Sequence, residues 1–397
     1  MSIADLRDAC AIVGVGTNHY PTAAGKPELE TLVDALDAAL LDAGLTRADI
    51  DGLMINVAPA EASMDALPMI VGLPNVGCAF QSWSHGRMNA MVVGVAALQV
   101  FSGLSRYTAC ISTFSADSFR ARRHSEKTGS DIELTREGGG PHLEAPHYGN
   151  TAPTGGAALA MQKYLMKYGY QQEDLGAVAV EQRAWAQANP NARLNGKPLT
   201  REEYNASRFV VEPLRIHDNS VLANTAVCVI VASTEHAKDL RQQPVLISGF
   251  QASTSSRDVF VFGRTNLGVG QQVDRPYTAP EDMAVYRMAG IGRDEVDILG
   301  IFDTVSPVVP FGLEEFGFCA EGEALAWLNE GHAGPSGKLP INTHGGSLSE
   351  GLTGGWGAIV ELVHQLRGTA GSRQVPNVDV GQYLMVDRSS LMLRRFS

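Results

Sequence analysis

The feature that most constrains the fold of this chain is a segment that occurs twice. Residues 43–54 read AGLTRADIDGLM, and residues 289–300 read AGIGRDEVDILG. In both copies a small residue and a glycine end an amphipathic helix, a short acidic turn follows, and an apolar strand begins. Glycine and then aspartate after a helix is also ordinary capping chemistry, so chance stays open as an alternative. We expect a duplicated α/β half.

The composition indicates an enzyme-sized globular protein. At 397 residues the chain exceeds one typical core. The net charge of −12 and the single short basic cluster at residues 120–124 argue against a nucleic-acid partner. That cluster is expected to be a solvated loop, although it could receive a phosphorylated ligand. The apolar stretches are shorter than the roughly 20 residues of a transmembrane helix, so we expect no membrane span.

The start of the chain and its cysteines bear on localisation. An apolar run begins at residue 11 without a charged and then apolar leader before it, so we expect no targeting segment. The five cysteines form no CxxC pair. They fit a reducing cytoplasm, where we expect the protein, and they offer no metal site.

Hydrophobic periodicity gives the layout. Residues 11–15 are continuously apolar, which is typical of a central strand covered on both faces. Residues 28–43 have helical spacing, and residues 88–101 are so uniformly apolar and small that they predict a helix buried on every side. Further strands are predicted at 50–57, 107–112, 226–232, 245–249, 296–302 and, as the last strand, 382–386, and further helices at 155–168, 174–189, 280–289, 310–316 and 356–367.

Charged and glycine-rich sequence from residue 114 to about 217 indicates an inserted loop lobe, which commonly builds binding sites over a rigid sheet. We therefore predict an N-terminal half, residues 1–240, that contains this lobe, and a C-terminal half, residues 241–397.

Local motifs resemble the thiolase superfamily, and within it the thiolase-like proteins of sterol-carrier and lipid-transfer type. The matching pieces are AIVGVG at 11–16, YG at 148–149 through YLMKYG at 164–169, SR with EPLR at 207–215, and INTHGGSLSEG at 341–351. The resemblance covers nearly the whole chain. It implies two βαβαβαββ halves stacked as five layers, α-β-α-β-α, in agreement with the internal repeat.

The resemblance also implies a nucleophilic cysteine, which this chain lacks. A thiolase carries that cysteine at the start of the buried helix, and matching the sequences puts the position at Gly86 or Trp83. Cys78 lies upstream and is expected to be a small buried hydrophobe. Phe302 stands where thiolases carry Asn or His, and Leu352 stands where they carry a second His. Cysteine-dependent thiolysis is therefore not expected.

One branch of the superfamily lacks the same cysteine. It comprises the aldolases of steroid side-chain degradation, which cleave a β-hydroxyacyl-CoA by a retro-aldol step together with a small zinc-ribbon/OB-fold partner. Residues 314–319, 342–346 and 366–368 look closer to that branch than to thiolases. A retro-aldol step needs a base for the β-hydroxyl group and stabilisation of the enolate. In those aldolases tyrosines stand where this chain has Phe302 and Leu352.

Three residues are candidates for proton transfer. His344 lies in the turn where the family pocket opens, and its imidazole could move a proton near pH 7; alternatively it binds the loop backbone. Asp303 could be a base if desolvated, or it could fix the glycine-rich turn. His85 could face the same cavity or only cap a turn.

Four residues are candidates for substrate contact: Tyr148 in the lobe, and Gly345, Gly346 and Ser347 in the glycine-rich turn. Ser347 could instead cap a helix, and Tyr148 could simply pack its ring. The substrate that the resemblance implies is a coenzyme A thioester. No P-loop or dinucleotide glycine pattern predicts a bound cofactor.

Three functions remain open from the sequence. The first is a retro-aldol acyl-CoA lyase with a small zinc-ribbon/OB-fold partner. The second is a non-catalytic pseudo-thiolase subunit of a hetero-oligomer, and the third is an acyltransferase that depends on Cys78. The resemblance also implies a homodimer, because family members place the central strand and the buried helix near a two-fold axis.

Overall fold

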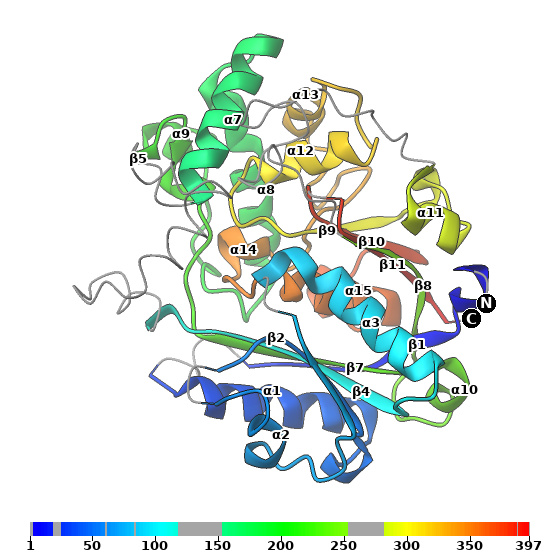
Figure 1. Ribbon diagram of the computed structural model, residues 1–397. Helices are drawn as coiled ribbons and strands as arrows, with labels where there is room; N and C mark the ends of the chain where they lie inside the picture. Colours follow the sequence, from blue (N-terminus) through cyan, green and yellow to red (C-terminus); the bar gives the residue numbers. More distant parts are fainter. Residues whose placement is uncertain are drawn as a thin grey trace.

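The computed structural model describes residues 3–18, 25–59, 62–82, 85–117, 153–252, 282–386 and 388–396. Within these ranges nine strands form one sheet in the order β3-β2-β4-β7-β1-β8-β11-β10-β9 (Figure 1). The first strand group is β1 (Cys10–Thr17), β2 (Gly52–Val57), β3 (Cys78–Gln81), β4 (Tyr107–Phe114) and β7 (Thr225–Ser233). The second is β8 (Val245–Gln251), β9 (Ile298–Ile301), β10 (Val380–Leu384) and β11 (Ser390–Arg395). The groups meet where β1 pairs with β8 through Ala11–Leu246 and Ile12–Val245.

Helices cover and separate the two strand groups. α3 (Asn89–Phe101) and α15 (Trp356–Arg367) lie between the groups and contact strands of both. α1 (Glu28–Ala43) and the short α2 (Leu67–Ile70) lie on the outer side of the first group, and α11 (Ala284–Ala289) packs on the second. This arrangement confirms the duplicated five-layer α/β fold of the thiolase-like proteins.

The short α10 (Thr234–Ala237) packs on β1 and β7, and the remaining helices lie beyond the second strand group, in the upper part of Figure 1. They include α7 (Pro153–Tyr168), α8 (Gly176–Gln187), α9 (Arg201–Ala206), α12 (Val308–Glu315), α13 (Ala324–Asn329) and α14 (Gly346–Ser349), with the hairpin of β5 (Phe209–Val211) and β6 (Leu214–Arg215). The first three helices and the hairpin belong to the predicted lobe, of which residues 118–152 lie outside the described residues. The division of the chain at residue 240 stays a prediction.

The repeated segment builds the same unit in both halves. α1 ends at Gly44, with φ 75°, and α11 ends at Gly290, with φ 62°; both glycines adopt the left-handed conformation that closes a helix. Each copy then makes a 3-10 turn and enters a strand: β2, which lies next to the edge strand β3, or β9, which is itself an edge strand. The short repeat read from the sequence therefore reflects a structural duplication.

The aspartate of each repeat fixes the start of a neighbouring parallel strand. Asp51 accepts hydrogen bonds from the backbone N–H groups of residues 106–107 at 2.9 Å, where β4 begins. Asp297 accepts from the backbone N–H groups of residues 379–380 at 2.8 and 2.9 Å, where β10 begins. The same carboxylate thus sets the register of a parallel pair in each half.

Several elements differ from the sequence-based expectations. The bounds of α1 and α15 are those predicted, but β3 and β11 were not predicted, because β3 has four residues without alternation and β11 follows a short turn. α3 is not buried on every side: Met91 and Val95 are half-buried and Leu98 is 37% exposed. Among the described residues, no helix has the length and apolar composition of a membrane span.

Replacing Asp297 should weaken the second half. Asp297→Ala leaves two backbone N–H groups without their carboxylate, and we expect it to lower the free energy of unfolding by about 1–3 kcal/mol. Asp294→Ala is the matched control, because the Asp294 side chain is 94% exposed. Chemical denaturation of the two variants checks this expectation, and equal midpoints would contradict it.

Candidate active site

The two central helices begin close to each other, one from each half. Gly86 lies in the 3-10 turn His85–Met88 that leads into α3, and its backbone packs against the carbonyl oxygen of Gly354. A Cβ atom on Gly86 would overlap that oxygen and would come within 2.5 Å of the Phe302 ring. The Tyr383 hydroxyl donates to the Gly86 carbonyl at 3.0 Å, and the Asn89 amide donates to the Gly354 carbonyl at 2.7 Å. No side chain fits at Gly86, one of the two positions at which the sequence match places the nucleophile of a thiolase; the other, Trp83, lies outside the described residues.

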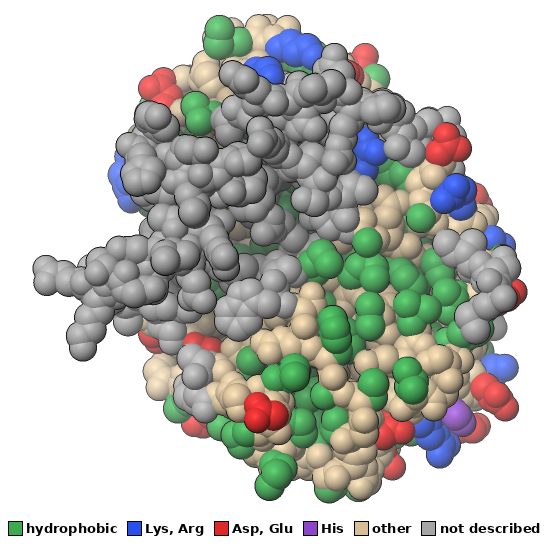
Figure 2. Space-filling model, in the orientation of Figure 1, with side chains coloured by type: hydrophobic (Ala, Val, Ile, Leu, Met, Phe, Trp, Pro, Cys, Tyr) green, Lys and Arg blue, Asp and Glu red, His purple; other side chains and the backbone are tan. Residues whose placement is uncertain are grey.

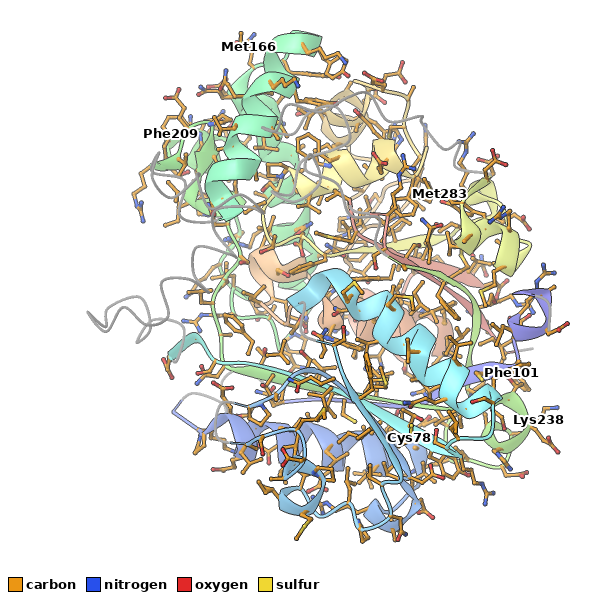
Figure 3. All side chains as sticks on the ribbon, viewed as in Figure 1. Cys78, Phe101, Met166, Phe209, Lys238 and Met283 are labelled. Carbon is orange, nitrogen blue, oxygen red and sulfur yellow. The ribbon has the colours of Figure 1, made fainter. Side chains whose placement is uncertain are left out.

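None of the thiols stands at Gly86. Cys110 lies against the first turn of α3, with its Sγ atom 3.9 Å from the Val92 carbonyl, and burial raises its pKa well above the usual value, which keeps it protonated. All five cysteines are described and free. Cys78 is 3.3 Å from the Gln99 amide nitrogen, and Figure 3 shows it toward the end of α3 that is marked by Phe101. Because Gln99 follows Asn89 by ten residues, Cys78 is roughly 15 Å along the helix from the start of α3. Burial raises the pKa of Cys10 and of Cys319 to about 12, which keeps both thiols protonated.

Asp303 follows β9 and is buried, with 1% of its surface exposed. Its carboxylate accepts hydrogen bonds from the backbone N–H groups of Ser347 at 2.8 Å and Leu348 at 3.3 Å, so it holds the first turn of α14. Burial raises the pKa of Asp303 to about 7, and these N–H donors oppose the rise. A group with this pKa can be protonated or ionised near neutral pH.

His344 is buried in the turn before α14. Asn189, just after α8, donates to the His344 carbonyl at 2.8 Å and to the Glu350 carboxylate at 3.0 Å. The Nε2 atom of His344 is 3.8 Å from that carboxylate, and Nδ1 has no hydrogen-bond partner among the described residues. Burial lowers the pKa of His344 to about 4, so the imidazole is neutral at pH 7 and has a free acceptor.

The His344 side chain lines a polar cleft between the end of β1 and one face of α15. An ion pair forms part of its wall: Arg373 donates to the Glu361 carboxylate at 2.9 and 3.0 Å. The remaining lining residues are Thr17, Asn18, Asn189, Asn191, Glu350, Thr353, Gly357, Val360 and His364. The cleft therefore offers several hydrogen-bonding groups beside the His344 side chain.

The structure brings some of the sequence-predicted residues together and not others. His344 and Asp303 flank the turn at residues 345–347, but their side chains have separate partners and make no hydrogen bond with each other. Gly345 packs on Ala186 of α8, Gly346 packs on the Asp303 carboxylate, and Ser347 is buried. The side chain of His85 and all of Tyr148 lie outside the described residues.

Sequence reasoning missed the residues that α8 contributes. Asn189 ties His344 to Glu350, and Gln182 packs on Gly346 beside Asp303. Their only sequence signal is polarity on an otherwise apolar helix face. Asn89 and Tyr383, which join the two halves at Gly86, gave no signal at all.

Comparisons with known proteins agree with this fold. Residues 280–386 match the family described as thiolase C-terminal domain-like. A steroid side-chain-cleaving aldolase from Thermomonospora curvata is 30% identical over 390 residues, which are 98% of each chain. A 17-hydroxy-3-oxo-4-pregnene-20-carboxyl-CoA lyase from Mycobacterium tuberculosis is 30% identical over 92% of this chain and 93% of its own.

Solved structures of thiolase-like proteins superpose on this fold as well. One titled Ltp2-ChsH2(DUF35) aldolase superposes with a TM-score of 0.85 at 28% identity and covers 98% of both chains. An acetyl-CoA acetyltransferase from Syntrophomonas wolfei superposes with a TM-score of 0.64 at 14% identity over 98% of this chain and 99% of its own, which shows a shared fold. The fold and the site define a thiolase-like protein without a thiol nucleophile. The chain belongs to the family of the steroid side-chain-cleaving aldolases in the thiolase superfamily.

The contact at Gly86 should not tolerate a side chain. Gly86→Ala puts a methyl group onto the Gly354 carbonyl, and we expect a loss of about 1–3 kcal/mol in the free energy of unfolding. Gly77→Ala is the control, because open space surrounds a Cβ atom there. Thermal unfolding of both variants measures the difference, and an unchanged Gly86→Ala protein would show that the two helix starts can separate.

Proposed function

We propose that this chain is an acyl-CoA lyase that cleaves a β-hydroxyacyl-CoA with a bulky, steroid-like acyl group by a retro-aldol reaction. The two relatives at 30% identity, named as an aldolase and a CoA lyase, support this function. The observation that carries it is the absence of room for a nucleophile at Gly86, because a retro-aldol step needs no acyl-enzyme.

The chemistry requires only proton transfers and enolate stabilisation. A base takes the proton of the β-hydroxyl group, and the bond between the α and β carbons breaks. The electron pair of that bond becomes the enolate of the CoA thioester, which takes up a proton, while the β carbon leaves as a carbonyl compound. Coenzyme A thus enters as part of the substrate.

We assign the base to His344. Its imidazole is neutral at pH 7 and lines a polar cleft, and its buried Nδ1 atom has no hydrogen-bond partner among the described residues, so the side chain can accept a proton. Asp303 acts on the turn beside it, and Gly345, Gly346 and Ser347 of that turn are proposed to contact the substrate. His85 and Tyr148 stay candidates for proton transfer and for substrate contact.

Loss of the imidazole should remove most of the turnover. His344→Ala deprives the β-hydroxyl group of its base, and we expect kcat to fall by about 10²–10⁴-fold. His332→Ala is the matched control, because His332 pairs with Glu330 outside the cleft. Release of the carbonyl product and of the shortened acyl-CoA measures the rate. Full turnover in the double variant His344→Ala, Asp303→Asn would exclude both residues from the chemistry.

A small partner protein is part of the proposal. The solved structure with a TM-score of 0.85 carries ChsH2(DUF35) in its title, which supports a small zinc-ribbon/OB-fold partner for this chain as well. The assay above therefore uses the chain together with such a protein. The five free thiols support the proposed location in the cytoplasm, where thiols stay reduced.

A non-catalytic subunit is the second candidate. Phe302 closes the start of α3 with a hydrocarbon ring at a position where thiolases carry a polar side chain. Stable binding to an active thiolase-like chain, without turnover by this chain and its small partner, would favour that function over the lyase.

We further propose a homodimer formed through the surface of α3 and β3. β3 is an edge strand of the described sheet, and Phe80 on it is 50% exposed. Met91, Val95 and Leu98 form a partly exposed stripe along α3, where Figure 2 shows apolar side chains gathered. An unpaired edge beside an apolar patch is suited to pairing with a second copy.

A charge on this stripe should separate the two copies. We expect wild-type protein to sediment as a dimer at micromolar concentration and Leu98→Glu to sediment as a monomer, because the carboxylate would be buried without a partner. Leu104→Glu is the control: Leu104 is 65% exposed and lies beyond the end of α3. A monomeric wild-type protein would contradict the proposal.

A further inference from the structure

The proposed reaction creates a negative charge that needs a hydrogen-bond donor of its own. When the bond between the α and β carbons breaks, the thioester becomes an enolate whose oxygen carries the charge, and a donor that is already in place stabilises this charge best. The polar cleft contains two acids, Glu350 and Glu361, which would repel the enolate. Arg373 is the only lysine or arginine among the described residues that line the cleft.

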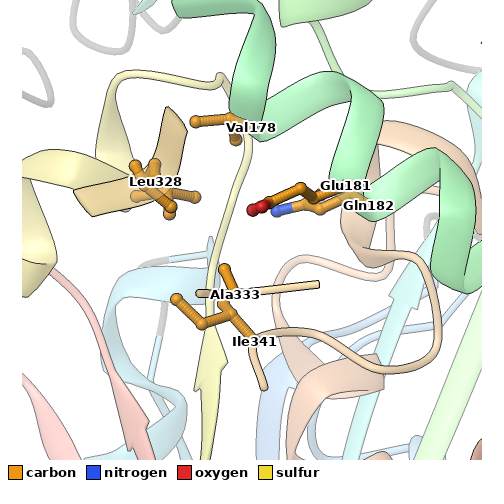
Figure 4. Close-up of a pocket in the computed structure, with 7 residues that line it drawn as sticks. Val178, Glu181, Gln182, Leu328, Ala333 and Ile341 are labelled. Atoms are coloured by element: carbon orange, nitrogen blue, oxygen red, sulfur yellow. The ribbon is translucent and has the colours of Figure 1, made fainter. Parts of the chain in front are cut away.

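A second cavity, beside α8, offers no cation. Figure 4 shows Glu181 and Gln182 there, among apolar side chains that include Val178, Leu328 and Ile341. Its described lining residues include neither a lysine nor an arginine. An anion in this cavity would meet a carboxyl group and hydrocarbon, and its burial would cost free energy without a compensating charge. The polar cleft is therefore better suited to an enolate.

Arg373 is fixed in the wall of the cleft by a two-point ion pair. Its Nε and Nη2 atoms donate to the two oxygens of the Glu361 carboxylate at 3.0 and 2.9 Å. The Thr343 hydroxyl and the Gln365 amide donate to the same carboxylate at 2.7 and 3.1 Å, so the acid is held as well. The Arg373 side chain is 14% exposed and that of Glu361 is 5% exposed. The guanidinium plane therefore has a fixed orientation.

The third nitrogen of the Arg373 guanidinium group is left for a ligand. Nη1 lies 3.5 Å from the Oδ1 atom of Asn189, which also accepts the backbone N–H of Asn191 at 3.0 Å. A contact of 3.5 Å is weak, and Nη1 carries two N–H groups, so at least one of them has no acceptor among the described residues. A donor that is held in place but not used is what a preorganised anion site requires.

Arg373 and the His344 imidazole belong to one group of side chains. Asn189 lies between them, because its amide nitrogen donates to the His344 carbonyl at 2.8 Å while its oxygen faces Arg373. The charge of Arg373 also reaches the imidazole: burial lowers the pKa of His344 to about 4, Glu361 opposes this fall, and Arg373 adds to it. A proton acceptor and a cationic donor thus line the same cleft.

We propose that Arg373 is a catalytic residue whose Nη1 atom binds the thioester oxygen and stabilises the enolate. This assignment rests on the proposed lyase function and deepens it. His344 takes the proton of the β-hydroxyl group, the bond between the α and β carbons breaks, and its electron pair makes the thioester oxygen negative beside Arg373. The α carbon then takes the proton back from His344, so the imidazole is neutral again when the products leave. Glu361 is a positioning residue that acts through Arg373.

Kinetics separate a contact with the enolate from a structural role. Arg373→Met alone would leave a buried carboxylate without its cation, so it is combined with Glu361→Gln. Because the charge forms only in the transition state, we expect the double variant, assayed with the small partner, to lower kcat and kcat/KM equally, by about 10²–10³-fold.

Glu361→Gln alone is the decisive comparison, because it removes the ion pair and keeps the guanidinium group. We expect it to retain at least about tenfold more turnover than the double variant. Equal losses in the two proteins would show that only the ion pair matters and would overturn the proposal. Arg293→Met is the matched control and should keep full turnover, because Arg293 is 43% exposed and is not among the lining residues.

Binding of an enolate mimic tests the same contact without turnover. Carboxymethyl-coenzyme A carries a carboxylate with the charge and nearly the shape of a thioester enolate. We expect calorimetry to show that the double variant Arg373→Met, Glu361→Gln binds this compound about 10–100-fold more weakly than Glu361→Gln does, whereas unmodified coenzyme A binds equally to both. Equal affinities for carboxymethyl-coenzyme A would overturn the assignment of Arg373.

The two measurements also separate the role of Arg373 from the proposed function. If the chain and its small partner cleave a β-hydroxyacyl-CoA equally well with and without Arg373, the lyase function holds and the role of Arg373 is rejected. If no β-hydroxyacyl-CoA is cleaved but the binding of carboxymethyl-coenzyme A depends on Arg373, the anion site holds and the lyase function is rejected.

Discussion

The contact between Gly86 and the Gly354 carbonyl is the constraint on which the site depends. It brings the starts of α3 and α15 together, and hydrogen bonds from Asn89 and Tyr383 hold it from both halves. Because backbone fills the place of a side chain at Gly86, a nucleophilic cysteine has no room at that position. The base that we propose instead, His344, lies in the turn before α14, and its Nδ1 atom has no hydrogen-bond partner among the described residues.

The lobe also helps to hold the candidate site, because residues of α8 and the turn after it contact the segment that carries His344. Three residues from α8 and the turn after it contact the glycine-rich turn and α14. Asn189 donates a hydrogen bond to the His344 carbonyl, and Gln182 packs on Gly346. Arg183 donates to the Ser349 hydroxyl at 2.9 Å. The turn is therefore held from the lobe on one side and from Asp303 on the other. A site assembled from distant segments in this way is sensitive to changes in any one of them.

Much of the fold could be predicted from the sequence, because its signals are local. The glycine and aspartate of each repeat predicted the helix end and the following strand, and apolar periodicity gave the bounds of α1 and α15. β3 has too few residues for a periodic signal, and the open face of α3 could not be foreseen from a uniformly apolar sequence. In the site, family motifs pointed to His344 and Asp303. The contacts of Asn189 and Gln182 could not be predicted, because they depend on how α8 packs against a turn about 160 residues away in the chain.

The placement of the cysteines has a consequence for the conditions under which such a protein can work. Burial keeps the Cys10 and Cys319 thiols in the unreactive protonated form, and Cys78 lies at the far end of α3 from the site. Peroxide or an alkylating reagent that would poison a thiolase therefore finds no thiol at Gly86. The proposed acid–base cleavage therefore uses no thiol that these reagents could modify.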